Sequence, residues 1–247
     1  MALSPQERKQ SGGLVKYFEK YRKEINLFVD QVRGRITETE DLFKQIHSIR
    51  WRIKEPSHLR GKLIRKVEEA HEKNEKFDIT EENLFSRIND LGGLRLLHLH
   101  TRQFDIINKA LLAALQEAQL PVIEGPIAKT WDDESRSYFR EIDVATEESE
   151  SLYTSVHYVI ESNFRTKYTC ELQVRTLAEE LWGEVSHAFH YPRPTKSIAC
   201  AEQIKVLARF TSGCSRLVDS VFRSHEEYQK GIGHVATKTA KGKGKKA

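Results

Sequence analysis

The sequence predicts a mixed α+β fold, with a mainly antiparallel sheet packed against helices and further helices flanking it at both ends. Three observations support this prediction. Short alternating segments rich in β-branched and aromatic residues, such as YTSVHYVIES and TKYTCELQVRT, are typical of strands. Longer segments repeat apolar residues at helical spacing. Both kinds of segment are interspersed along the middle of the chain, whereas its first and last long segments are helical.

The first half of the chain predicts helices, a strand, a helix and a second strand. Apolar residues recur at helical spacing over 14–49, which predicts one or two amphipathic helices with a break at Gly34. SIRWRIK alternates like a strand, and SHLRGKLIRKVEEAHEK is helical. In ITEENLFSRIND, Thr80 is a typical helix start. LRLLHLH (94–100) predicts a buried strand.

The second half adds a hairpin and long helices. QFDIINKALLAALQEAQ predicts a helix, and PVIEGPIAKTWDDESRSYFREIDV predicts a strand, a loop and a second strand. The two alternating segments quoted first form an antiparallel pair around a turn at Ser162–Thr166. LAEELWGEVSHAFHY and AEQIKVLARFTSGCSRLVDSVFRSHEEYQK are helical. We therefore expect an N-terminal helical extension (1–46), a central domain (47–195), C-terminal helices (196–232) and a basic, disordered tail (233–247).

Composition limits the class of protein. The 247 residues are 38% hydrophobic and 31% charged, which suits one domain with terminal extensions. No stretch approaches the roughly 18 apolar residues that span a bilayer, and the polar start MALSPQERKQSGG lacks a secretory core. Three cysteines without metal-type spacing argue against a disulfide framework or a Cys-based zinc site. We expect a cytoplasmic protein with no membrane partner.

The charge is unevenly distributed. The formal net charge is +4, and without the lysines of the tail it falls to about −1, so a positive site in the folded body must be local. The tail fits an RNA-contacting arm, because lysines displace counterions from phosphates, but it fits a solvated end as well. Its lysines are Lys238, Lys241, Lys243, Lys245 and Lys246.

Three segments combine charged residues with a strand edge or a sharp turn. In the first, alternation puts Arg52 and Lys54 on one strand face, and Lys62 follows early in the next helix, which suits a polyphosphate clamp or a solvated charged surface. In the second, Asp90 precedes a glycine pair and an apolar strand, as a metal ligand or a turn cap would. In the third, alternation puts two rows of polar side chains each on one strand face, and such a face is either solvated or forms a site. The rows are Tyr153, Ser155 and His157, and Glu171, Gln173 and Arg175.

These segments, in this order and spacing, resemble the synthetase domain of the RelA/SpoT family, particularly its single-domain members, the small alarmone synthetases, whose fold is nucleotidyltransferase-like. The resemblance covers about residues 47–192. Each motif is weak alone, but four in register are specific. They are Arg52, Lys54, Pro56 and Lys62; Asp90, Gly93 and Arg95; Tyr153, Ser155 and His157; and Glu171, Gln173, Arg175 and Thr176, followed by Trp182 and His187.

The resemblance implies attack of an acceptor 3′-hydroxyl on the β-phosphorus of ATP with release of AMP, making a (p)ppGpp-type alarmone when the acceptor is GDP or GTP. Asp90 and Glu171 would be the catalytic carboxylates and hold Mg²⁺. Phosphates and adenine of ATP would contact Arg52, Lys54, Lys62 and Arg95. The acceptor would contact Tyr153, Ser155, His157, Gln173 and Arg175. Family members often assemble through their flanking helices, so a homo-oligomer is expected.

Two departures leave the acceptor open. His58 stands where the family usually has serine, and the acidic run 147–150 stands where guanosine-nucleotide synthetases carry a lysine before the tyrosine. Adenosine nucleotides, or the 3′ end of tRNA as in toxins of this fold, are therefore alternative acceptors, and a non-catalytic nucleotide- or RNA-binding module is a further alternative. The chain has no His-Asp pair of the family hydrolase and no P-loop. His98 and His100 suit a strand core or edge better than a zinc pair.

Overall fold

The computed structural model describes residues 4–149, 151–190 and 195–243. It divides into two compact units. The sheet unit comprises Met1–His98 and Phe104–Arg175, and the helical unit comprises Leu99–Gln103 and Thr176–Ala247. No helix among the described residues is long and apolar enough to cross a membrane.

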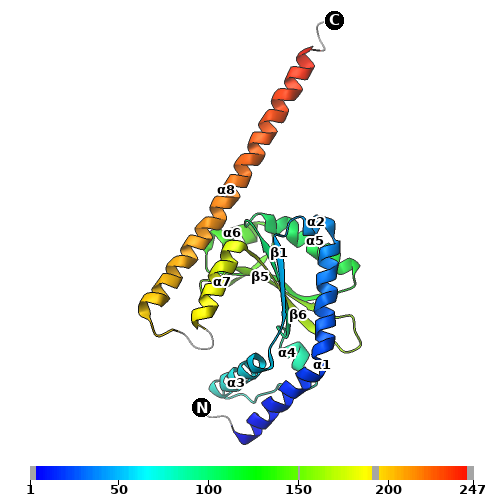
Figure 1. The fold of residues 1–247 in the computed structure, drawn as a ribbon, viewed down its shortest axis with the longest axis vertical. Helices are drawn as coiled ribbons and strands as arrows, with labels where there is room; N and C mark the ends of the chain where they lie inside the picture. The colour runs from blue at the N-terminus through cyan, green and yellow to red at the C-terminus, as the bar shows by residue number, and fades with distance from the viewer. Residues whose placement is uncertain (1–3, 150, 191–194, 244–247) are drawn as a thin grey trace. The chain divides into compact units, whose positions relative to one another are not determined.

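The sheet unit is built on six strands in the order β1-β2-β6-β5-β3-β4 (Figure 1). The pairs β1–β2, β5–β6 and β3–β5 are antiparallel, and β3–β4 is parallel. The prediction of a mixed, mainly antiparallel sheet is therefore confirmed. The strands are β1 (Ser48–Ile53), β2 (Gly92–His98), β3 (Val122–Thr130), β4 (Ala145–Glu148), β5 (Ser155–Glu161) and β6 (Thr169–Thr176).

Helices surround this sheet, and the first belongs to the core rather than to an extension. Val32 and Ile36 of α1 are fully buried on either side of Gly34. Helix α1 continues to Glu38, so the break predicted at Gly34 is wrong. A helical glycine costs about 1 kcal/mol, which burial of these side chains outweighs. The helices are α1 (Pro5–Glu38), α2 (Glu40–Phe43), α3 (Pro56–Glu72), α4 (Leu84–Arg87), α5 (Gln103–Glu117) and α6 (Asp133–Glu141).

Two local predictions are corrected. The expected loop after β3 contains α6, whose N-cap Asp132 accepts a hydrogen bond from the backbone N–H of Ser135 at 2.8 Å. Only Phe139 of α6 is buried, and the helix is nine residues long with few apolar residues, so apolar spacing did not predict it. The helix expected from Thr80 begins at Leu84, because the N–H of Thr80 is bound by the side chain of Asn83 in a turn instead.

The helical unit contains α7 (Leu177–His190) and α8 (Ile198–Lys243). Trp182 Nε1 donates to the carbonyl of Ile204 at 3.0 Å, and the hydroxyls of Thr176 and Ser215 are 2.9 Å apart. These contacts pair the helices antiparallel. Helix α8 reaches Lys243, so most of the segment predicted as a disordered tail is helical, consistent with its alanines and lysines. Residues 244–247 lie outside the described part.

The close approach of β3 to β5 at Gly125 can be tested by its effect on the free energy of unfolding. Gly125 has φ +95°, and a Cβ there would lie 2.3 Å from the carbonyl oxygen of His157 and 3.0 Å from the Cα of Tyr158. We expect Gly125→Ala to lower the free energy of unfolding by about 3 kcal/mol, because both the clash and the positive φ oppose it. Gly34→Ala, with open space at the Cβ, should instead raise it by about 1 kcal/mol. Urea unfolding measures both, and an unchanged midpoint for Gly125→Ala would contradict the prediction.

Candidate active site

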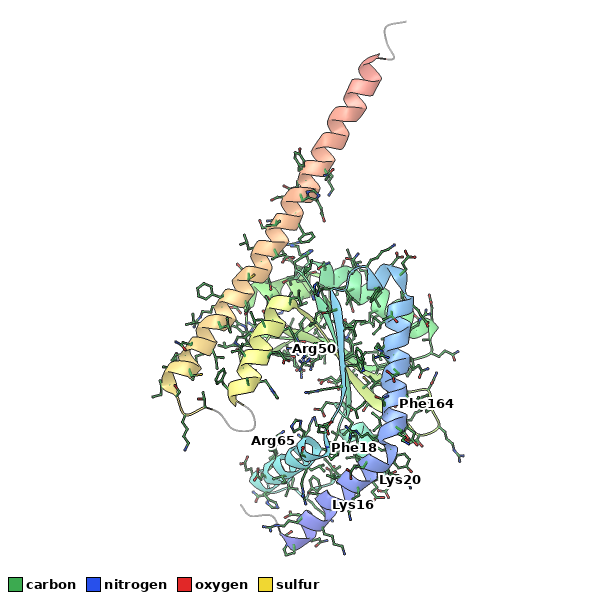
Figure 2. All side chains as sticks on the ribbon, viewed as in Figure 1. Lys16, Phe18, Lys20, Arg50, Arg65 and Phe164 are labelled. Carbon is green, nitrogen blue, oxygen red and sulfur yellow. The ribbon has the colours of Figure 1, made fainter. Side chains whose placement is uncertain are left out.

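One face of the sheet is polar. On β1, Ile49 and Ile53 pack against the core, so the alternating residues Arg50, Arg52 and Lys54 project to the other side. Figure 2 shows Arg50 on the side of β1 away from α1. In β2, β5 and β6 apolar residues also alternate with polar ones, and their buried apolar side chains belong to the same core. These are Leu94, Leu96, Val156, Tyr158, Leu172 and Val174.

Strand register extends this polar face across the sheet. Residues paired directly across two strands project to the same side. Arg50 pairs with Arg95, and His157 pairs with Gln173. On the next strand, Lys129 pairs with Ser155. The polar rows predicted on separate strands thus lie on one face of the sheet, which also carries the basic side chains of Arg50, Arg95 and Lys129. Arg50 and Lys129 were not among the predicted site residues, although the alternation Arg50-Arg52-Lys54 signals the first.

Asp90 is held between two lysines. Its Oδ2 lies 2.6 Å from Lys54 Nζ, and its Oδ1 lies 2.8 Å from Lys62 Nζ. Burial opposes ionisation of Asp90, but the two ammonium charges outweigh it and hold the Asp90 pKa below its ordinary value. Burial likewise lowers the pKa of Lys54, despite the attraction of Asp90. Both oxygens of this carboxylate therefore accept charged hydrogen bonds.

Glu171 is the second carboxylate of the face. Its Oε1 lies 2.9 Å from His157 Nδ1, and its Oε2 accepts a hydrogen bond from Gln173 Nε2 at 3.1 Å. Burial raises the pKa of Glu171, but the hydrogen bond and charge of His157 hold it below the ordinary value. The charge of Asp90 acts on Glu171 in the raising direction. The two carboxylates are therefore within electrostatic range of each other.

Tyr153 lies beside this pair. Its hydroxyl donates to Gln173 Oε1 at 3.1 Å and lies 3.3 Å from His157 Nε2. The guanidinium of Arg175 stands 5.3 Å from the centre of its ring, and Arg175 Nη2 donates to Gln173 at 2.8 Å. Burial raises the pKa of the Tyr153 phenol. The ring thus contacts the cation of Arg175 and lies edge-to-face with the His157 ring, with the ring centres 5.8 Å apart.

The predicted site residues differ in accessibility. Arg52 is exposed and within electrostatic range of Lys54. Arg95, predicted to contact ATP, is within electrostatic range of Tyr153, predicted to contact the acceptor. Ser155 is only 1% exposed and its hydroxyl is directed at the Val174 carbonyl, 3.5 Å away. Because it is buried, Ser155 is better placed to support the neighbouring side chains than to contact a substrate directly.

The residues outside the site have structural contacts. His58 is exposed in the first turns of α3. Trp182, from the fourth motif, ties α7 to α8 within the helical unit. His98 is buried, and His100 Nδ1 lies 2.5 Å from Asp219 Oδ1 of α8. His98 thus lies in the core at the end of β2, as expected, whereas His100 lies beyond the strand and contacts α8 instead.

The acidic run lies on the edge strand β4. Glu147 pairs with Lys129 of β3, with its Oε2 3.5 Å from Lys129 Nζ. Glu148 is the next residue along the strand and therefore projects to the other face. Leu152 follows with φ +55°, in the left-handed region that glycine favours. Of the two carboxylates of the run that the structure describes, Glu147 thus projects to the polar face, where Lys129 partly neutralises it.

The residues present fit a magnesium ion. Mg²⁺ binds through one or two carboxylates together with substrate phosphates and waters. Asp90 and Glu171 supply two carboxylates on one face, and among the described residues no cluster of three or more His, Cys, Asp or Glu side chains could hold a metal. The other ligands would then be phosphate oxygens of a nucleotide and water.

Carboxylates set among lysines and arginines on one sheet face are typical of an enzyme that binds phosphorylated substrates with a divalent metal. The family described as "Region found in RelA / SpoT proteins" matches residues 51–196. The chain therefore belongs to the RelA/SpoT family. Family and fold together support a pyrophosphotransferase of the alarmone synthetase type.

Solved structures share the fold. Small alarmone synthetase 1 from Bacillus subtilis, bound to its product pppGpp, is 18% identical with a TM-score of 0.56, covering 85% of this chain and 97% of that chain. A GTP pyrophosphokinase family protein from Streptococcus pneumoniae is 17% identical with a TM-score of 0.56, covering 87% and 95%. The Bacillus subtilis synthetase bound to AMPCPP is 19% identical with a TM-score of 0.51, covering 87% and 97%. No curated protein matches the chain.

Proposed function

We propose that this protein transfers pyrophosphate from ATP to the 3′-hydroxyl of a guanosine or adenosine nucleotide. The observation that carries the proposal is the pairing of Asp90 with Lys54 and Lys62 on the same sheet face as Glu171. A non-catalytic module would have no need for two ionised carboxylates within electrostatic range of each other. Their pKa values below the ordinary range keep both charged at neutral pH.

The ATP side uses the cations of β1, β2 and α3. The triphosphate takes the place of Asp90 as partner of Lys54 and Lys62, which lie nearest the carboxylate. Asp90 is then available to hold Mg²⁺, which supplies charge neutralisation on the transferred phosphates. Arg52 and Arg95 contact the remaining phosphates or stack on adenine. Before the nucleotide binds, the two lysines neutralise the charge of Asp90.

The acceptor side uses the hairpin of β5 and β6. Tyr153 stacks on the acceptor base, and His157 and Gln173 contact its sugar or phosphate. Glu171 accepts the proton of the 3′-hydroxyl, whose oxygen forms a new bond to the β-phosphorus of ATP. The bond between that phosphorus and the oxygen of the α-phosphate breaks, and AMP leaves with the bridging oxygen. Because His157 contacts Glu171, it orients the carboxylate that takes the proton.

An acceptor screen tests the proposal. The protein is incubated with ATP and Mg²⁺, together with GDP, GTP, an adenine nucleotide or deacylated tRNA, and AMP and the pyrophosphorylated product are resolved. We expect AMP and product to form in equal amounts with at least one free nucleotide. Product with tRNA alone would replace the proposal by the toxin alternative. If neither AMP nor product forms with any acceptor, only the alternative of a non-catalytic nucleotide- or RNA-binding module remains.

Glu147 is expected to weaken binding of a phosphorylated acceptor. We expect Glu147→Gln to lower the KM for the acceptor by about threefold, because Lys129 loses its anionic partner and about 0.6 kcal/mol of repulsion is removed. The matched control is Glu148→Gln, which removes the neighbouring charge from the opposite face. Equal effects of the two changes would show that only the net charge of the strand matters.

A further inference from the structure

Trp131 directly follows β3, where the pairing with β5 continues past the end of the strand. Lys129 is paired with Ser155 in the antiparallel ladder. The hydroxyl oxygens of the next two residues, Thr130 and Thr154, lie 2.9 Å apart, and both side chains are buried. The register therefore holds for one more residue on each strand. A further step places Trp131 opposite the residue that precedes Thr154.

The residue opposite Trp131 is Tyr153. Side chains alternate along an extended chain, and residues directly opposite each other project to the same side, so Trp131 shares the polar face with Lys129 and Tyr153. The Tyr153 ring contacts the cation of Arg175 and the ring of His157. Trp131 therefore adds a second aromatic surface to the acceptor side of the site, next to a ring that already has neighbours.

The indole of Trp131 is not anchored by a hydrogen bond. Its Nε1 is buried, and no described residue accepts a hydrogen bond from it. A buried donor without a partner costs about 1–3 kcal/mol. Trp182, by contrast, donates from Nε1 to the carbonyl of Ile204. Because the rest of the Trp131 residue is partly exposed, a ligand that shifts the ring breaks no hydrogen bond and can supply the missing acceptor.

A cation lies beside this aromatic surface. Lys129 and Trp131 are two residues apart, which is about 7 Å along an extended chain. The Lys129 side chain is 39% exposed, and its Nζ lies 3.5 Å from Glu147 Oε2, longer than a direct charged hydrogen bond. An aromatic surface next to a cation suits a ligand that joins a planar base to phosphate groups. A nucleotide has this chemistry.

We propose that the purine base of the acceptor packs on Trp131 beside Tyr153, so that Trp131 selects purine over pyrimidine acceptors. The role of this nucleotide as acceptor rests on the proposed transfer reaction. Base–aromatic stacking is worth about 1–3 kcal/mol, and the two fused rings of indole overlap a purine over a larger area than a pyrimidine. The groups proposed for ATP lie on β1, β2 and α3, so loss of the indole should affect the acceptor and not ATP.

Tryptophan fluorescence measures acceptor binding without the transfer reaction. The donor site is filled with an ATP analogue that has a methylene bridge between the α- and β-phosphates and cannot release AMP. In a Trp51→Phe protein, which keeps Trp131 and the buried Trp182, we expect GDP or ADP to quench the emission. UDP should need a concentration about fivefold higher or more. With Trp131→Phe added, the same nucleotides should leave the remaining emission unchanged.

Steady-state kinetics separate base recognition from a structural role. Trp131→Ala should raise the KM for the acceptor about fivefold to a hundredfold, and Trp131→Phe should raise it less, because phenylalanine keeps a stacking surface. The turnover number and the KM for ATP should change less than about twofold. Trp51→Phe is the matched control, because Trp51 lies against Arg33, and it should leave both KM values unchanged. Circular dichroism verifies that each variant is folded.

The outcomes distinguish this inference from the transfer reaction. Quenching that Trp131→Phe abolishes, in a protein that forms no product, supports the base-binding role and refutes the transfer. Quenching that persists after Trp131→Phe overturns the inference, as does the absence of quenching with every free nucleotide. An unaltered acceptor KM in Trp131→Ala also overturns it, and so does an equal rise in the KM for ATP, which would indicate a structural role.

Discussion

Asp90→Asn is expected to lower the rate of pyrophosphate transfer by about a thousandfold or more. Asparagine keeps the shape of the side chain but removes the negative charge that both lysines contact at 2.6 and 2.8 Å. In phosphoryl transfer, charge neutralisation and positioning provide most of the catalysis, so loss of a metal-binding carboxylate affects the main contribution. Steady-state release of AMP with a saturating acceptor measures the effect.

The same substitution should also destabilise the fold. Lys54, whose side chain is 10% exposed, loses its partner and stays close to Lys62. Breaking such a largely buried pair costs about 2–3 kcal/mol. Asp78→Asn is the matched control, because it removes an exposed aspartate whose partner is Arg87, and it should change stability by less than about 0.5 kcal/mol. Full activity of a folded Asp90→Asn protein would remove Asp90 from the mechanism.

Glu171→Gln is expected to lower the turnover number by about a hundredfold to ten thousandfold, the range of a general base. The KM for ATP should change little, because Lys54, Lys62 and Asp90 are untouched. Glu161→Gln, at the far end of the same hairpin and beside Lys167, is the control and should retain full activity. A rise in the KM for ATP with an unchanged turnover number would assign Glu171 to binding instead of proton transfer.

These carboxylates also determine how stability depends on pH. The folded pKa values of Asp90 and Glu171 lie below their ordinary values, so each stabilises the folded state above the unfolded pKa of about 4. That contribution is lost as the pH falls through the lower, folded pKa. We expect the free energy of unfolding to fall between about pH 5 and pH 2, and to fall less steeply in Glu171→Gln. Urea titrations across this range measure the slope.

Much of the site followed from local patterns. Alternation placed Glu171, Gln173 and Arg175 on one strand face, and their side chains contact one another in that order. Period-two geometry is a property of each strand alone, so it can be deduced without knowing the neighbours. The same reasoning missed α6, because this nine-residue helix contains only two apolar side chains, Tyr138 and Phe139, too few to show a repeat.

The sequence by itself determined the fold class, the hairpin of β5 and β6, and the family. These depend on residue types and spacing within short segments. The tertiary structure alone decided that two lysines from different elements contact Asp90 and that Lys129 faces the acidic edge strand. The physical reason is that strand order and register arise from pairing between residues far apart in the chain, which no local period records.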